Sequence, residues 1–141
     1  MAKSLSAFLA QNAKKVDNRK IAASPRFVDE NGKPMEWEIA CITASENQKL
    51  RKESTRNVPT SKRGQYTQDF DTALYQAKLA TKCVVFPDLN DKELQDSYGV
   101  MSAEQLISAM LTPGEFDDLI LSIVELNGFT PEGELVDEAK N

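Results

Sequence analysis

Apolar residues recur with helical spacing near the C-terminal end of the chain. In the segment 113–126 they are separated by intervals of one to three residues that fall on one side of a helix. These positions are Phe116, Leu119, Ile120, Ile123, Val124 and Leu126. Thr112 and Glu115 have the spacing of a capping box, and Asn127-Gly128 is a common helix ending. Because the apolar face is wide, we expect this helix to be central to the core.

Further helices are predicted upstream by the same combination of spacing and caps. Asp71 caps a helix that should end before Pro87, and Ser102 caps another. Asn90 and Glu93 have capping-box spacing at the start of a third. The apolar positions are Leu74, Ala77, Leu79 and Val84 in the first of these helices, and Leu106, Ile107 and Met110 in the second.

The middle of the chain is more polar. Thr43 and Glu46 form a predicted capping box for a helix that runs to about Arg56 and carries few apolar residues, chiefly Leu50. The stretch 58–65 combines proline, glycine, serine and basic residues. We therefore expect it to be an exposed loop.

Strand-like alternation is found between residues 19 and 42. Large apolar or sulfur-containing residues alternate there with glutamate or alanine, at Met35, Trp37, Ile39 and Cys41. This period of two is typical of a strand with one buried face. Asn31-Gly32 supplies the positive φ that a tight turn needs. The pattern predicts a β-hairpin.

The two ends of the chain differ from the middle. Leu5, Phe8 and Leu9 share one helical face, but the segment is too short to be stable alone, so it must dock on the core or on a partner. The end of the chain is acidic and poor in large apolar residues, which predicts disorder.

These elements together predict an α+β fold, with a small antiparallel β-hairpin element followed by a cluster of about four to five helices. We expect a single globular domain over 1–128 and an acidic disordered tail over 129–141. Within the domain we expect an N-terminal arm or helix (1–18), the hairpin (19–42) and the helical part (43–128).

Charge is distributed unevenly along the chain. The net charge is -5, but residues 1–64 carry a net +6 and residues 65–141 a net -11. Such polarity permits head-to-tail self-association or attraction to a charged partner. Alternatively, each half simply has a solvated charged face. The chain has no secretory leader pattern and no apolar run long enough for a bilayer, so we expect a cytoplasmic protein without a membrane partner.

The usual residues of catalytic and metal sites are missing or scattered. The chain has no histidine and two cysteines, Cys41 and Cys83, both in apolar surroundings that predict buried free thiols. No phosphate-binding glycine motif or nucleophile elbow is present. We expect no cofactor, no metal and no enzymatic activity. A basic stretch at Lys49, Arg51, Lys52, Arg56, Lys62 and Arg63 suggests a competing but weaker interpretation, a nucleic-acid-binding regulator.

Several stretches of the sequence together form a distinctive set of motifs. They are SLSAFLAQN at the N-terminus, RFVDENGKPMEWEI, RGQYTQDFDTALYQAKLA, the long VVFPDLNDKELQDSYGVMSAEQLISAMLTPGEFDDL of residues 84–119, and ELVDEAKN at the end. In these motifs the chain resembles the XkdN-like tail assembly chaperone family of phages and of defective prophages such as the PBSX-like elements. The resemblance extends over nearly the whole chain.

The resemblance implies a non-catalytic chaperone that binds the tape measure protein during assembly of a long phage tail. It also implies contact with the tail tube protein, which would replace the chaperone. Chaperone genes of this kind are often read in two frames, and Ala139-Lys140-Asn141 is compatible with a slippery site. A frameshifted longer form of the chain is therefore a further expected partner. The alternative is a structural component that stays in the tail.

Candidate partner-binding residues fall in three places, and for each the alternative is packing within the chain itself. They are Leu5, Phe8 and Leu9 near the N-terminus, Tyr98, Val100 and Met101 between two helices, and Leu126, Phe129, Leu135 and Val136 towards the C-terminus.

Overall fold

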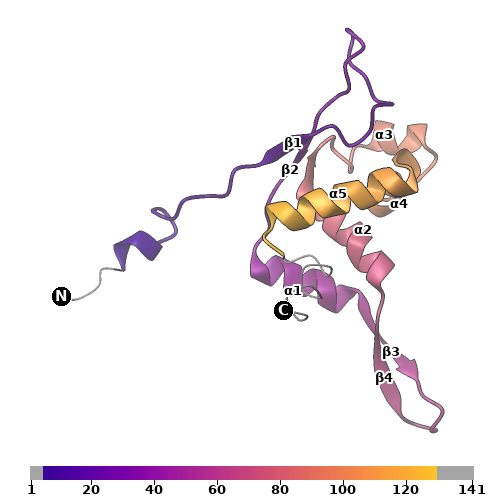
Figure 1. The fold of residues 1–141 in the computed structure, drawn as a ribbon. Coiled ribbons are helices and arrows are strands. Elements are labelled where there is room, and N and C mark those ends of the chain that lie inside the picture. The colour runs from indigo at the N-terminus through magenta and orange to yellow at the C-terminus, as the bar shows by residue number, and fades with distance from the viewer. Residues whose placement is uncertain (1–4, 130–141) are drawn as a thin grey trace, which may run out of the picture.

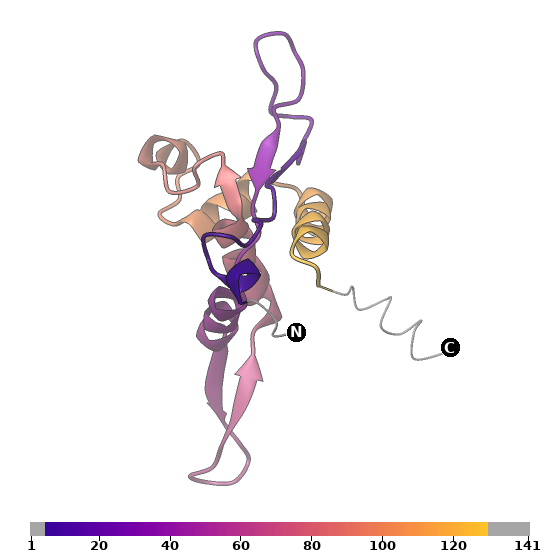
Figure 2. The ribbon, with the colours of Figure 1, turned by 90° about the vertical axis from the view of Figure 1, so that its left-hand side faces the viewer.

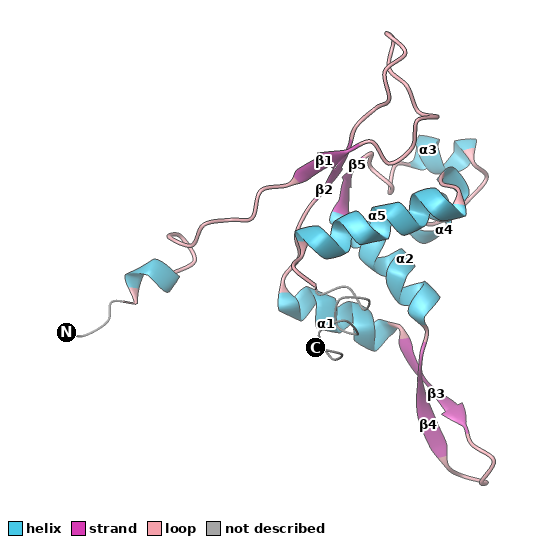
Figure 3. Cartoon of the chain, viewed as in Figure 1, coloured by secondary structure: helices cyan, strands magenta, loops and turns pink. Residues whose placement is uncertain are grey.

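The computed structural model describes residues 5–129. Figures 1 and 3 show a body of helices packed beside a small sheet, with an extended N-terminal arm. In chain order the elements are the 3₁₀ turn η1 (Ser6–Phe8), β1 (Arg19–Ile21), β2 (Trp37–Ile39), α1 (Ala44–Glu53), β3 (Thr55–Pro59), β4 (Tyr66–Phe70), α2 (Thr72–Cys83), β5 (Val84–Phe86), α3 (Lys92–Ser97), α4 (Ala103–Met110) and α5 (Pro113–Leu126). The predicted α+β class is confirmed.

The main sheet has three short antiparallel strands in the order β1-β2-β5. β1 pairs with β2 so that Arg19 faces Ile39, and the chain between them makes the predicted turn. There the Asp29 carboxylate accepts hydrogen bonds from the amides of Asn31 and Lys33, and Gly32 has a φ of +79°. The predicted hairpin is therefore present, although its paired strands are short.

β5 was not expected from the sequence. The predicted helix from Asp71 ends at Cys83, and Val84 begins a strand that pairs with β2. The pairing removes Val84 from solvent at the same time as it completes the sheet. A three-residue apolar run has no periodicity that separates a strand from a helix. The sequence pattern therefore predicts a helix that continues beyond Cys83.

The expected loop over 58–65 is also wrong in part. Residues Thr55–Pro59 and Tyr66–Phe70 form a two-stranded antiparallel hairpin, and only the tip between them is a loop. Accordingly α1 ends at Glu53, and Arg56 lies in β3. Figure 2 shows this hairpin at one end of the elongated molecule and the chain between β1 and β2 at the other.

Helix caps agree closely with the sequence. Thr43 with Glu46 and Thr112 with Glu115 form complete capping boxes at α1 and α5. The side chains of Asp71 and Ser102 cap α2 and α4. The cap of α3 differs from the prediction by one residue, because Asp91 and not Asn90 accepts from the amide of Leu94.

The core lies between the sheet and helices α2, α4 and α5. Its fully buried side chains include Trp37, Ile39, Leu79, Cys83, Leu106, Ile107, Leu119 and Ile123. Helix α5 contributes Leu119 and Ile123 to the core, which agrees with the central position predicted for it. Its side chains Phe116, Ile120 and Leu126 are partly buried at the margin of the core. Asn127, just after α5, ties this helix to the sheet side, because its Oδ1 accepts from the amide of Ile42 at 2.8 Å.

Candidate binding surfaces

The first candidate surface is the N-terminal arm, residues 5–18. The predicted helical patch forms a single 3₁₀ turn, closed by the side-chain amide of Asn12, which donates to the carbonyl of Ser6 at 2.7 Å. The side chains of Leu5, Phe8 and Leu9 are all exposed, Phe8 by 81%. The arm leads away from the body (Figure 1), so the core does not cover these side chains.

The second candidate surface is the link between α3 and α4. Gly99 adopts a φ of +67° there, and the amide of Val100 donates to the carbonyl of Gln95. This turn directs Val100 onto the core and leaves Met101 91% exposed. Tyr98 is partly exposed beside it. The link therefore offers one prominent apolar side chain.

The described part of the third candidate surface, Leu126 and Phe129, is engaged within the chain. Leu126 and Phe129 pack against the core, and the amide of Phe129 donates to the carbonyl of Val124. Phe129 was expected in the disordered tail, but it packs on the core; Leu135, Val136 and the rest of the predicted acidic tail, residues 130–141, lie outside the described residues. The structure thus gathers the exposed candidates at the arm and at the link.

An apolar pocket is a further surface, which the sequence did not indicate. It has a volume of about 180 Å³ and is lined by Phe27, Met35, Trp37, Phe86, Pro87, Leu94 and Met110. Trp37 and Met110 are buried at its base, while Met35 and Phe86 remain accessible at its edge. Five separate segments contribute to the pocket, so no local sequence pattern reveals it.

Acidic side chains lie on both sides of this apolar pocket. A depression that shares Phe86 with it is lined by Glu36, Glu38 and one lysine, Lys20. Another depression, which shares Leu94, is lined by Asp91 and Glu93. The Arg26 guanidinium also lies next to the pocket, 5.1 Å from the Phe27 ring, but it is paired with Glu115. The border therefore keeps a net negative charge, which favours an apolar group carried by a basic segment.

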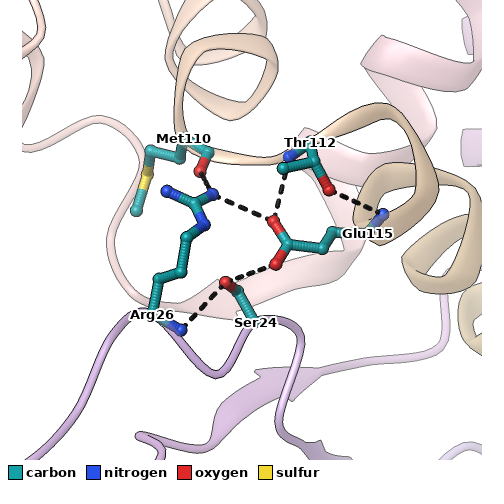
Figure 4. Close-up of polar contacts among 5 residues, drawn as sticks. All are labelled: Ser24, Arg26, Met110, Thr112 and Glu115. Atoms are coloured by element: carbon teal, nitrogen blue, oxygen red, sulfur yellow. Dashed lines mark hydrogen bonds and ion pairs between the residues drawn. The ribbon is translucent and has the colours of Figure 1, made fainter.

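A network of polar contacts holds Ser24 and Arg26, which precede the pocket residue Phe27, onto the start of α5 (Figure 4). The Arg26 guanidinium contacts the Glu115 carboxylate at 2.9 Å, and the Ser24 hydroxyl donates to the other carboxylate oxygen at 2.6 Å. Arg26 also donates to the carbonyl of Met110, and the amide of Thr112 donates to Glu115. Both carboxylate oxygens of Glu115 accept hydrogen bonds within the network, so Glu115 has a structural role.

Glu115 should make the stability of this region dependent on pH. Its hydrogen bonds from Arg26, Ser24 and the Thr112 amide lower the pKa of the carboxyl from 4.5 to about 2. A lowered pKa in the folded state stabilises the protein fully above pH 4.5, and this contribution disappears as the pH falls towards 2. We expect Glu115→Gln to lower the urea unfolding midpoint at pH 7 and to differ less from the wild type near pH 3.

The matched control is Asp118→Asn, which removes an exposed carboxylate from the same helix. It should leave the midpoint nearly unchanged at both pH values. A Glu115→Gln midpoint equal to that of the wild type at pH 7 would contradict the stabilising role of the network.

The thiols and carboxylates of this chain are side chains that could hold a metal ion or act as a nucleophile. The 5–129 region contains no group of three or more cysteine, aspartate or glutamate residues that could hold a metal ion. Both cysteines are free, and burial raises the pKa of the Cys83 thiol to about 11, which makes it a poor nucleophile. Cys83 is buried as expected, whereas Cys41 is only half-buried. No helix among the described residues is long and apolar enough to cross a membrane.

Two residues of the basic stretch make contacts within the chain. Arg51 lies over the rings of Phe70 and Tyr75, with 5.0 Å from its guanidinium carbon to the Phe70 centroid. Arg56 pairs with Asp69 across the β3–β4 hairpin at 3.6 Å. Two of the six predicted phosphate contacts are thus occupied within the chain.

Comparison with known proteins agrees with this picture of a binding protein. The family model described as phage XkdN-like tail assembly chaperone protein matches residues 5–140. The phage-like element PBSX protein XkdN of Bacillus subtilis (strain 168) is 29% identical over 139 residues, which cover 97% of this chain and 93% of the relative. YqbN from the same organism is 26% identical over 136 residues, or 96% of this chain and 91% of YqbN.

A solved structure shows the same fold. The crystal structure of YqbN superimposes with a TM-score of 0.77 at 24% identity, and the match covers 92% of this chain and all of that one. The family model spans almost the entire chain, from the arm to the acidic end. The protein therefore belongs to the XkdN-like phage tail assembly chaperone family.

Proposed function

We propose that this chaperone binds the tape measure protein while a long phage tail is being built. The observation that carries the proposal is the exposure of Leu5, Phe8 and Leu9 on an arm that leaves the body. Apolar side chains that the chain's own core does not cover mark an interaction site. The tail assembly family supplies the class of partner, and the arm supplies a surface for it.

The chemistry of the arm suits a long apolar helix. A short segment with apolar side chains on one face can lie along such a helix and cover its apolar stripe. Met101 on the α3–α4 link would add a second contact through a flexible side chain that adapts to different partners. Several weak contacts of this kind hold a partner collectively and still allow stepwise release.

Release would then follow when tail tube subunits cover the same partner. The role needs no catalysis and no cofactor, and it would take place in the cytoplasm of the host bacterium. A frameshifted longer form of the chain would join the same complex through this domain.

Co-expression with the tape measure protein of the same gene cluster tests the proposal. We expect a soluble complex that co-purifies through a tag on either partner, and an insoluble tape measure protein when it is expressed alone. If the two never associate and the chain is found in purified tails, it is a structural tail component instead.

A further inference from the structure

The described chain carries exposed apolar side chains on its N-terminal arm and an apolar pocket beside its sheet. We propose that the arm of one copy places Phe8 in the pocket of a second copy, so that the purified chaperone self-associates from arm to pocket. This inference concerns the chaperone alone and does not depend on its binding to the tape measure protein.

Size and chemistry support this pairing. The pocket measures about 180 Å³, and a cavity of about 150 Å³ is known to hold a benzene ring. Its walls include the rings of Phe27, Trp37 and Phe86, against which a further phenyl ring can pack in tilted geometry. Phe8 is 81% exposed, which makes it the most exposed aromatic residue of the described chain.

Charge complementarity between the arm and the surroundings of the pocket also supports the pairing. Lys14 and Lys15 follow Phe8 by six and seven residues, about 20 Å in extended chain. The depressions next to the pocket are lined by Glu36, Glu38, Asp91 and Glu93 against one lysine, Lys20. The Arg26 guanidinium, 5.1 Å from the Phe27 ring, is paired with Glu115. An arm seated through Phe8 would therefore bring its lysines over a net negative surface.

The course of the arm favours a second copy over the same chain. The arm enters β1, which lies at the edge of the sheet opposite β5, whereas the pocket includes Phe86 of β5. In Figures 1 and 3 the arm leads away from α3, the helix that contributes Leu94 to the pocket. Residues 9–18 can extend by about 33 Å, enough for the arm to reach a neighbour.

Light scattering on the purified protein tests the proposal with two complementary variants. Phe8→Ala removes the group that fills the pocket, and Met35→Lys places a cation at the pocket edge, where Met35 is partly exposed. We expect the wild type to exceed the monomer mass of 15.7 kDa, and each variant to associate about 10- to 100-fold more weakly.

Mixing the two variants identifies the geometry. The Phe8→Ala chain keeps its pocket and the Met35→Lys chain keeps its arm, so their mixture should form a heterodimer and nothing larger. Leu121→Lys, the same kind of change at an exposed leucine of α5, should associate like the wild type. A wild type that stays monomeric at about 100 μM, or a mixture that stays monomeric, would overturn the proposal.

The single tryptophan gives an independent measurement, because Trp37 lines the pocket. A peptide of residues 5–18 contains no tryptophan. Added to the wild-type protein, it should change the Trp37 emission in a saturable way. The same peptide with Phe8→Ala should not. Equal titration curves for the two peptides would show that Phe8 does not enter the pocket.

Discussion

Replacing Leu5, Phe8 and Leu9 together by serine is expected to abolish co-purification of the tape measure protein. All three side chains are exposed, so the substitution removes contacts with a partner and no contacts of the core. The free energy of unfolding should therefore stay within about 0.5 kcal/mol of the wild type. Pull-down from co-expressing cells measures the first effect, and urea unfolding measures the second.

The matched control changes exposed apolar residues elsewhere. Val28 and Leu121 are 52% and 48% exposed, and serine at both positions should leave the complex intact. If the arm variant still recovers the tape measure protein at the wild-type level, the binding surface lies elsewhere, and the Met101 link becomes the next region to alter.

Ile123→Ala should lower the free energy of unfolding by about 2–5 kcal/mol. Ile123 is fully buried on α5, and its loss leaves a cavity that the surrounding helices can fill only in part. Since small domains are stable by about 5–15 kcal/mol in total, this single change removes a large share of the stability. Urea unfolding followed by circular dichroism gives the value.

Leu121→Ala is the control for this variant, since Leu121 lies on the same helix with its side chain 48% exposed. Alanine is a strong helix former, so its effect should stay within about 0.5 kcal/mol. Similar losses for the two variants would mean that α5 is not packed as described.

Features encoded over a few residues were predictable from the sequence. The capping boxes at Thr43 and Thr112 depend on a donor and an acceptor three residues apart, and both are present. Gly128, with a φ of +78°, ends α5 for an equally local reason. The alternation predicted correctly that Trp37 and Ile39 are buried, whereas Met35 is 37% exposed and Cys41 is only half-buried, because the paired strand spans Trp37–Ile39 alone.

Features that depend on distant pairing were not predictable. The strands β3 and β4 lack apolar alternation because nearly all their side chains are exposed, so their pairing has no pattern in the sequence. Val84–Phe86 became a strand only because β2 offered an unpaired edge. The apolar pocket combines Phe27, Phe86 and Met110 from distant segments, and only the tertiary fold brings them together.

The exposed β3–β4 hairpin provides a place to attach a reporter. Its tip, residues 60–65, is mostly exposed and lies at the far end of the molecule from the chain that joins β1 and β2 (Figure 2). Exposed loop tips tolerate insertions well. A fluorophore or a gold label at Ser61 would therefore mark each chaperone in electron micrographs or in distance measurements along a growing tail, while the arm and the pocket stay unmodified.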